Sequence, residues 1–525
     1  MRDFHQEPPT LGNQYDADTV LRAYLRRRLP AEMLAEIEPG LRRLGGRVAT
    51  DILALGEAAE ALPPRHVAYD GWGRRLDRIE TSAAWRTLDR VAAEEGLVAI
   101  GYERAHGSLS RVDQFARLYL YSPSSAIHSC PLAMTDGAAR FLEVYGDGHT
   151  RPAFERLTSR NPDRFWTSGQ WMTERTGGSD VSRTSTRAQP AGEADDGVYR
   201  LYGDKWFTSA TTSQVAVTLA RIDGAPAGSR GLSVFFVELR DPDGALRNIR
   251  IHRLKDKLGT RALPTAELTL EGTPARLVGG TGDGVRKISA LFNVTRIYNA
   301  VAAAGGMRRA VALARDYADR RTAFGKPLRE HPLHAATLAE LELECRAAFH
   351  LTFRVVELLG REECGEASPA ESELLRLLTP VAKLYTAKQA VAVASEAIEA
   401  FGGQGYVEDT GLPRLLRDAQ VLPIWEGTTN VLSLDVLRAI DKTGALDHVL
   451  ADVRARVGQV RLAELAPAVE RVRRAADRIE AYTDRAAADT GLRQAGARAF
   501  AYAIARTCAA SLLVEHASSC PAADD

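Results

Sequence analysis

The sequence predicts a mainly α-helical protein with one antiparallel β domain in its middle. Three observations lead to this prediction. Apolar residues recur at three- and four-residue spacing from about 51 to 165, the period of helices with one buried face. From about 167 to 278, short β-branched or aromatic runs are separated by turn residues. Long helical patterns then return from Val285 to about Leu437.

The length and composition are those of several packed globular units. The chain has 525 residues, of which 45% are hydrophobic and 26% charged. We therefore expect five segments: an N-terminal arm (1–50), an N-terminal helical domain (51–166), a β domain (167–280), a four-helix domain (281–440) and a C-terminal helical extension (441–525). The strand–helix alternation that a Rossmann fold or TIM barrel requires is not present in the sequence.

The first two segments are predicted from helical spacing. The arm is polar and contains prolines before a helical pattern from Ala23 to Leu44, which indicates a docking arm. In the helical domain, Leu88, Val91 and Ala92 follow the spacing of one buried helix face.

Glycine-containing turns separate the strands of the β domain, and a Gly-rich stretch separates that domain from the helices after it. Runs such as 215–220, 232–239 and 266–270 are bounded by Asp-Gly or Glu-Gly pairs, which favour turns between strands. A Gly-rich stretch at 279–284 precedes the long helices of the four-helix domain. The extension that follows is rich in Ala and Arg and helical in pattern.

Charge and cysteine content exclude several classes of protein. Lys and Arg number 68 and so do Asp and Glu, so the chain as a whole has no long-range attraction for nucleic acid or an acidic membrane. The five cysteines are far apart and form neither a disulfide framework nor a Cys-x-x-Cys metal site. With no apolar leader and no apolar run of membrane-spanning length, we expect a cytoplasmic protein without a bound metal or membrane contact.

Two motifs lie at the entrance to the β domain. Residues 171–180 read Trp-Met-Thr-Glu-Arg-Thr-Gly-Gly-Ser-Asp, where the Gly pair lets backbone N–H groups approach an anionic or planar ligand and the hydroxyls can bind oxygens. The other reading of this motif is a simple turn. Residues 205–209 place two aromatic side chains before two hydroxyls, which fits either a strand core or the wall of a flavin ring.

Three further motifs lie in the four-helix domain. Residues 320–327 place Arg321 at the end of a helix, where it is either a cap or a clamp on pyrophosphate. The break at 401–406, Phe-Gly-Gly-Gln-Gly-Tyr, lets a nucleotide approach the backbone. In 423–430, Glu426 stands between Trp425 and Gly427; apolar neighbours can tune a Glu toward general-base work, although a solvated surface Glu fits as well.

Taken in order, these five motifs resemble those of the acyl-CoA dehydrogenase family. The Trp206-Phe207-Thr208 segment is similar to its Trp-x-Thr strand, and Trp425-Glu426-Gly427-Thr428 is similar to its Tyr-Glu-Gly-Thr catalytic motif. The segments 69–77, 253–259 and 424–427 resemble the AidB branch, the alkylation-response flavoproteins.

The resemblance implies a helical domain, a β domain and a four-helix domain, with FAD held between the last two and a neighbouring subunit of a homotetramer built as a dimer of dimers. It implies Glu426 as the base that removes the α-proton of an acyl thioester while a β-hydride passes to the flavin, with the Glu426 backbone N–H and a flavin hydroxyl polarising the thioester carbonyl. The cofactor-binding residues that it implies are Met172, Thr173, Gly178, Ser179, Trp206, Thr208, Arg321, Phe324, Gly402, Gly403, Trp425 and Thr428. Arg296 and Trp425 are the expected substrate contacts; an ion pair is the alternative reading of Arg296.

The sequence departs from the family pattern at three positions. Some branches of the family carry the catalytic base on an earlier helix. At that position this chain has Thr295, which leaves Glu426 as the base. Trp425 replaces the usual Tyr and would narrow the acyl pocket, so we expect a small or branched acyl group, or a thioester other than CoA. Ala323 stands where Thr is common, which removes one hydroxyl from the flavin clamp.

Two other functions stay open at this point. AidB-type proteins are associated with DNA, but residues 441–525 carry twelve basic and twelve acidic residues, so DNA binding is possible without being favoured. Arg471, Arg474 and Arg478 share helical spacing and would be its contacts. The other alternative is a flavin oxidase or monooxygenase of secondary metabolism, since the electron acceptor, an electron-transfer flavoprotein or oxygen, is not readable from motifs.

Overall fold

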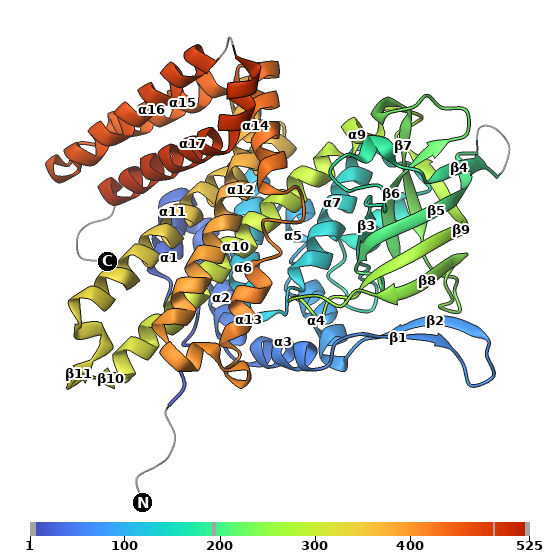
Figure 1. The fold of residues 1–525 in the computed structure, drawn as a ribbon, viewed down its shortest axis with the longest axis horizontal. Helices are drawn as coiled ribbons and strands as arrows, with labels where there is room; N and C mark the ends of the chain where they lie inside the picture. The colour runs from blue at the N-terminus through green and yellow to red at the C-terminus, as the bar shows by residue number, and fades with distance from the viewer. Residues whose placement is uncertain (1–6, 192–195, 487–488, 520–525) are drawn as a thin grey trace, which may run out of the picture. The chain divides into compact units, whose positions relative to one another are not determined.

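A computed structural model describes residues 7–191, 196–486 and 489–519 (Figure 1). The first six residues of the predicted arm and the last six of the extension, with Cys520, lie outside the described residues. The described chain divides into two compact units, each discussed by itself below. The first unit comprises 1–50, 104–123 and 299–525, and the second comprises 51–103 and 124–298.

The first unit is helical, and its longest helices are α11 and α12. Ser368 caps α12 with a capping box to Glu371, and Pro369 takes the first helical position, where its missing N–H costs nothing. The helices of this unit are α1 (Thr19–Arg28), α2 (Ala31–Arg47), α6 (Ser110–Tyr121), most of α10 (Ser289–Arg320), α11 (Pro332–Glu363), α12 (Pro369–Ala400), α13 (Leu412–Ala419), α14 (Thr429–Thr443), α15 (Ala445–Gln459), α16 (Ala466–Ala486) and α17 (Thr490–Ser519).

The segment expected to be a docking arm folds into two helices of the first unit. Pro30 separates α1 from α2. The hydroxyl of Tyr24 donates to Glu357 of α11 at 2.7 Å, and Arg28 pairs with Glu515 of α17 at 3.0 Å. The N-terminal helices therefore hold the middle and the end of the same chain together.

Helix α17 is the one described helix that is long and apolar enough to cross a membrane. Of its apolar window, 61% is buried inside the protein, and it packs against α11, α14, α15 and α16. The sequence reading found no run of this kind, because small residues such as Ala501 and Ala505 supply much of the apolar character. The packing is that of a core helix.

The second unit contains a β-hairpin in a stretch where the sequence predicted helices. Strands β1 (Arg65–Tyr69) and β2 (Arg75–Glu80) pair antiparallel. The turn between them is stabilised by Asp70, whose side chain accepts from the N–H groups of Trp72 and Arg74 at 2.9 Å. The helices of the second unit, besides the first part of α10, are α3 (Asp51–Ala61), α4 (Ala83–Glu94), α5 (Ile100–Glu103), α7 (Ser129–Tyr145), α8 (Arg151–Leu157) and α9 (Gly284–Lys287).

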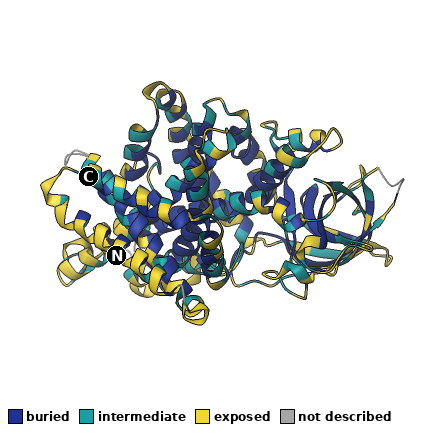
Figure 2. Ribbon diagram, turned by 90° about the horizontal axis from the view of Figure 1, so that it is seen from above, coloured by how far each residue is buried: buried dark blue, intermediate teal, exposed yellow. Residues whose placement is uncertain are grey.

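A seven-stranded sheet forms the β domain of the second unit (Figures 1 and 2). Its strands are β3 (Ser168–Trp171), β4 (Arg187–Pro190), β5 (Val198–Ser209), β6 (Val215–Ile222), β7 (Leu232–Glu238), β8 (Ile249–Leu254) and β9 (Thr265–Val278). The order β3-β6-β4-β5-β9-β7 closes on itself because β6 also pairs with β7. Most pairings are antiparallel, but β3 and β4 run parallel to β6, which corrects the purely antiparallel expectation. The predicted fold class, helical domains around a central β domain, is confirmed.

Candidate active site and cofactor-binding motifs

The predicted site residues fall in both units. The second unit carries the first group, Met172, Thr173, Gly178, Ser179, Trp206, Thr208 and Arg296. The first unit carries the second group, Arg321, Phe324, Gly402, Gly403, Trp425, Glu426 and Thr428.

The loop after β3 presents the first motif. Met172 is buried, whereas Gly178 and Ser179 are exposed. A side chain on residue 178 would place its Cβ 2.7 Å from the Thr173 hydroxyl oxygen, so this position needs glycine. The loop thus holds an exposed Gly-Ser backbone against the Thr173 hydroxyl, which is the cradle that a phosphate or a flavin oxygen requires.

Glu174 anchors this loop from inside the protein. Its carboxylate accepts from both the backbone N–H and the hydroxyl of Ser185 at 2.6 Å, and it pairs with the buried Lys205 ammonium at 2.9 Å. Thr186 donates to it in the same way. Burial raises the pKa of Glu174, but the Lys205 charge and these donors outweigh burial and lower the pKa to about 2. The carboxylate therefore stays charged and fixes both ends of the loop.

Strand β5 brings the second motif to the first. The backbone N–H of Trp206 donates to the Thr173 carbonyl at 2.9 Å, and the Trp206 side chain is half-buried. The Lys255 ammonium lies 3.8 Å from the centre of that ring. Thr208 is fully buried, and its hydroxyl donates to the Ala266 carbonyl at 2.8 Å, so this side chain does not face a ligand in this structure.

The third motif is a hairpin at the end of α10. Strands β10 (Thr322–Ala323) and β11 (Lys326–Pro327) are joined by Phe324 and Gly325, both with left-handed backbones (φ +49° and +83°). Phe324 is 96% exposed. Within the described part of the chain, the Arg321 guanidinium makes no hydrogen bond or ion pair, and its residue is exposed. An unpaired guanidinium three residues before an exposed aromatic side chain is available to another molecule.

The Gly-rich break after α12 offers a bare backbone. Gly402 (φ +60°) and Gly403 are exposed, and a Cβ at either position would meet no atom within 4 Å. At Gly405 a Cβ would come within 2.0 Å of the Ile398 carbonyl oxygen. Gly405 is therefore a packing glycine, while Gly402 and Gly403 leave room for a ligand.

Glu426 lies in the turn between α13 and α14 with a left-handed backbone, φ +56°. This region is unfavourable for a residue with a side chain, and such strain clusters at functional sites. The Lys383 ammonium of α12 donates to the carbonyls on both sides, those of Trp425 at 2.7 Å and Gly427 at 2.6 Å. Lys383 is fully buried, so these bonds hold the strained turn in place.

The neighbours of Glu426 complete the turn. Gly427 has φ +105°, and a Cβ there would come within 2.9 Å of the Leu432 side chain. Thr428 begins α14 without capping it through its side chain and is exposed. The Trp425 indole nitrogen is buried without a hydrogen-bond partner among the described residues. The turn thus carries Glu426 and the exposed Thr428 next to an indole nitrogen without a hydrogen-bond partner among the described residues.

Helix α10 carries the expected substrate contact. Arg296 is half-buried, and its neighbour Thr295 is buried with its hydroxyl donating to the Phe292 carbonyl at 3.1 Å. A hydroxyl engaged in this way, with no carboxylate at the position, fits the prediction that Glu426 is the base.

Sequence reasoning missed Lys383 and Lys255 as parts of the site. A signal for Lys383 was available, since it is a lone lysine among Val381, Ala382 and Leu384, and a lysine on a buried face needs partners. Its partners are more than forty residues away, so the sequence could not name them. Lys255 appeared only as part of a branch motif.

Helix α16 carries the arginines that the DNA-binding alternative would use. Arg471, Arg474 and Arg478 are exposed on it. Arg474 approaches Glu470 at 3.9 Å, and the neighbouring Asp477 and Glu480 both bind Arg454. The face is therefore mixed in charge.

Four family models match almost the whole chain. They are the AidB adaptive response protein N-terminal domain (6–164), the acyl-CoA dehydrogenase middle domain (169–273), the acyl-CoA dehydrogenase C-terminal domain (282–440) and an acyl-CoA dehydrogenase 11 C-terminal domain-like model (445–525).

Known proteins match over similar lengths. Acyl-CoA dehydrogenase family member 11 of Caenorhabditis elegans is 45% identical, covering 98% of this chain and 86% of its own. Its crystal structure in complex with C11-CoA covers 99% of this chain and 90% of its own, with a TM-score of 0.96. The structure described as Bd2924 apo-form is 52% identical, with a TM-score of 0.91 over 98% of this chain and all of its own. Putative acyl-CoA dehydrogenase AidB of Escherichia coli is 35% identical over 78% of this chain and 76% of its own.

A β domain in the middle of the chain, with helical segments before and after it, is the architecture of the acyl-CoA dehydrogenase fold, which supports an oxidoreductase. The chain belongs to the acyl-CoA dehydrogenase family. Within it, the N-terminal domain places the protein in the AidB-like branch. Its cofactor is FAD. Which residues hold FAD stays a prediction; Gly178 in the second unit, and Gly402 and Gly403 in the first, each have an exposed backbone that a phosphate oxygen could approach.

Proposed function

We propose that the protein oxidises an acyl-CoA thioester between its α and β carbons, with Glu426 as the base. The observation that carries this proposal is the strained Glu426 turn, whose two flanking carbonyls are bonded to one buried ammonium. A strained side chain that is held this firmly is typical of a residue with a chemical task.

The chain's own residues supply position and proton transfer. The Glu426 carboxylate would take the α-proton, and the Glu426 backbone N–H would polarise the thioester carbonyl oxygen, where negative charge develops as the proton leaves. Bound FAD supplies the acceptor for the β-hydride. Trp206, Thr173 and Ser179 would hold the ring and pyrophosphate, while the Arg321 guanidinium would reach the pyrophosphate of a neighbouring subunit.

The acyl group is the least constrained part of the proposal. Trp425 is larger than the usual Tyr and favours a small or branched acyl group. The relative crystallised with C11-CoA is similar over nearly the whole chain and favours a longer one. A substrate panel should therefore run from short and branched thioesters to an eleven-carbon thioester.

The test is an anaerobic titration of the oxidised flavoprotein with that panel. Loss of flavin absorbance in the wild type, and not in Glu426→Gln, supports the proposal. Glu399→Gln is the matched control, since Glu399 is exposed on α12 and its carboxylate makes no hydrogen bond or ion pair within the described chain. Equal bleaching in Glu426→Gln would remove Glu426 from the role of base.

The assembly, acceptor and location follow as parts of the same proposal. The unpaired Arg321 and the exposed Phe324 support a homotetramer in which one subunit completes another's flavin site. Reoxidation with an electron-transfer flavoprotein or with oxygen distinguishes a dehydrogenase from an oxidase or monooxygenase. The described cysteines are free thiols, which supports a cytoplasmic location.

A further inference from the structure

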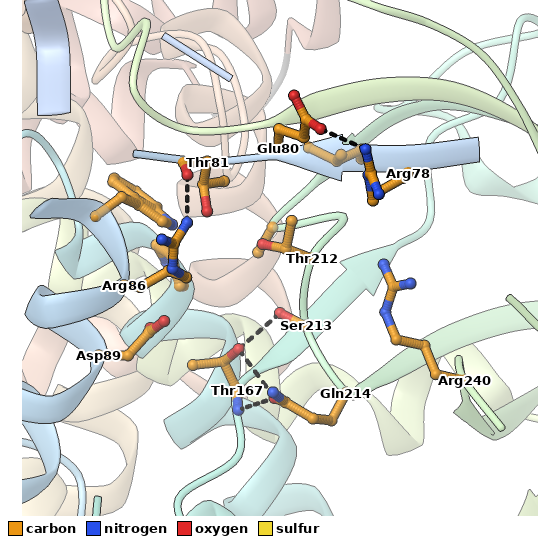
Figure 3. A pocket seen from close by; sticks show the side chains of 14 residues that line it. Arg78, Glu80, Thr81, Arg86, Asp89, Thr167, Thr212, Ser213, Gln214 and Arg240 are labelled. Atoms are coloured by element: carbon orange, nitrogen blue, oxygen red, sulfur yellow. Dashed lines mark hydrogen bonds and ion pairs between the residues drawn. The ribbon is translucent and has the colours of Figure 1, made fainter. Parts of the chain in front are cut away.

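A polar cavity lies within the second unit. It has a volume of about 450 Å³, within the range of small-molecule pockets. Its walls come from the end of β2, from α4, from the turn between β5 and β6, and from Arg240, the second residue after β7 (Figure 3). No family motif singled out by the sequence lines it.

Three arginines line this cavity from three different elements. Arg78 belongs to β2, Arg86 to α4, and Arg240 follows β7. In Figure 3 the Arg240 guanidinium rises toward Arg78, and Arg86 lies on the other side of Thr212. Guanidinium groups that converge from separate elements suit an anion with several oxygens.

Two of these arginines are not neutralised by a carboxylate. Arg86 donates to the Thr81 carbonyl, and Arg240 donates to the Gly244 carbonyl at 3.0 Å; neither forms an ion pair within the described chain. Arg240 is half-buried. A guanidinium that gives up water without an anionic partner carries an electrostatic cost that an anionic ligand would offset.

The two carboxylates of the cavity already have cationic or histidine partners. Glu80 binds Arg78 at 2.7 Å and is shared with a further arginine, Arg65, at 2.8 Å. Asp89 lies 2.9 Å from the His128 ring nitrogen. With three arginines and two carboxylates in its lining, the cavity carries a net positive formal charge.

The wall that carries Arg78 is held in place. The buried Asp77 accepts from the Ile251 N–H of β8 at 3.1 Å and from Arg75 at 2.7 Å. Arg75 in turn donates to the Ile251 carbonyl at 2.6 Å. These bonds hold β2 to the sheet, so the guanidinium of Arg78 is presented from a fixed strand.

We propose that this cavity is a binding site for a small phosphorylated molecule, held by Arg86, Arg240 and the Thr212 hydroxyl. Thr212 makes no side-chain hydrogen bond within the described residues, and a phosphate group offers three oxygens to donors that arrive from different directions. A planar carboxylate would engage one guanidinium well and leave the others unmatched. The concave shape favours a small phosphate ester over a nucleic acid backbone.

The test uses the oxidised holoprotein with saturating CoA, so that other phosphate-binding positions are occupied. Inorganic phosphate and succinate are titrated calorimetrically into wild type, Arg86→Gln, Arg240→Gln and the double variant. We expect phosphate to bind the wild type more tightly than succinate, each single variant to weaken it about tenfold, and the double variant to abolish it. Arg200→Gln is the control, since Arg200 also donates only to a carbonyl, that of Gly272, outside the cavity.

Several results would overturn the site: no phosphate binding in the wild type, stronger binding of succinate, or equal loss in Arg200→Gln. Melting temperatures measured without phosphate show whether each variant is folded. If one variant does not fold, the other arginine still tests the site, since Arg86 and Arg240 are independent positions. The measurement involves no acyl substrate, so its failure is distinguishable from failure of the proposed dehydrogenase activity.

Discussion

Lys383 fixes the backbone of Glu426, because its buried ammonium donates to the carbonyl before that residue and to the carbonyl after it. The two bonds keep Glu426 in a left-handed conformation that a residue with a side chain rarely adopts. The predicted base, which lies in the turn before α14, is therefore positioned by a residue of α12.

Replacement of Lys383 by Met should slow flavin reduction by acyl-CoA at least about tenfold, because the Glu426 turn loses both of its anchors. Leaving two half-buried carbonyls without their shared donor should also lower the free energy of unfolding, by about 1 kcal/mol for each group. Stopped-flow reduction measured across pH tests the positioning role, since a displaced base changes the pH profile as well as the rate. Lys388→Met on the same helix is the control, and a similar loss there would refute the specific role of Lys383.

The strain at residue 426 predicts a reversal of the usual order of Ala and Gly. At most positions a Gly variant is less stable than the Ala variant. At φ +56°, however, we expect the Glu426→Gly variant to be more stable than Glu426→Ala by about 1 kcal/mol. Both variants should fail to reduce the flavin. Urea unfolding of the pair measures the difference, and a more stable Ala variant would mean that the backbone here is not left-handed.

The Glu174–Lys205 pair should make the β domain sensitive to acid. The folded pKa of Glu174, about 2, lies below its unfolded value, so its contribution to stability is present above about pH 4.5 and is lost as the pH falls toward 2. Glu174→Gln should cost about 3–5 kcal/mol, because it leaves Lys205 buried without its partner. The double variant Glu174→Gln/Lys205→Met should be less destabilised than the sum of the single variants. Additive single effects in a double-mutant cycle would show that the two charges are not coupled.

Arg321→Gln should weaken FAD binding about tenfold or more, since a charged clamp on pyrophosphate is lost. Release of fluorescent FAD on dilution measures this effect. Arg329→Gln provides the comparison, because Arg329 follows the same hairpin but pairs with Asp319 at 3.1 Å. Unchanged FAD retention in Arg321→Gln would remove this residue from the cofactor site.

The mixed charge of α16 leads us to expect no strong binding to duplex DNA. Fluorescence anisotropy with a labelled duplex at low and at physiological salt checks this. Salt-sensitive binding that Arg474→Ala/Arg478→Ala abolishes would instead favour the DNA-associated alternative.

What the sequence predicted correctly is local. The Gly-rich loops and the Trp-Glu-Gly-Thr turn are short motifs whose backbone requirements are encoded in neighbouring residues, so the positive φ values at Gly402 and Gly427 agree with the sequence. The alternation of helical and strand patterns was sufficient for the fold class.

The relationships that the sequence did not predict are between distant residues. Lys383 and Glu426 lie on different elements, and nothing local links them. The sequence named Glu174 and Lys205 as motif members, but only the folded β domain pairs them. The β1–β2 hairpin was missed because its few apolar residues, such as Val67 and Ile79, give a weak alternating pattern inside a helical stretch.

The central claim, that Glu426 removes the α-proton, is tested most directly by an isotope effect. The flavin of the wild type is reduced anaerobically by one thioester, either unlabelled or deuterated at the α carbon. We predict slower reduction with the deuterated thioester, and no reduction in Glu426→Gln. Reduction of Glu426→Gln at the wild-type rate would contradict the account.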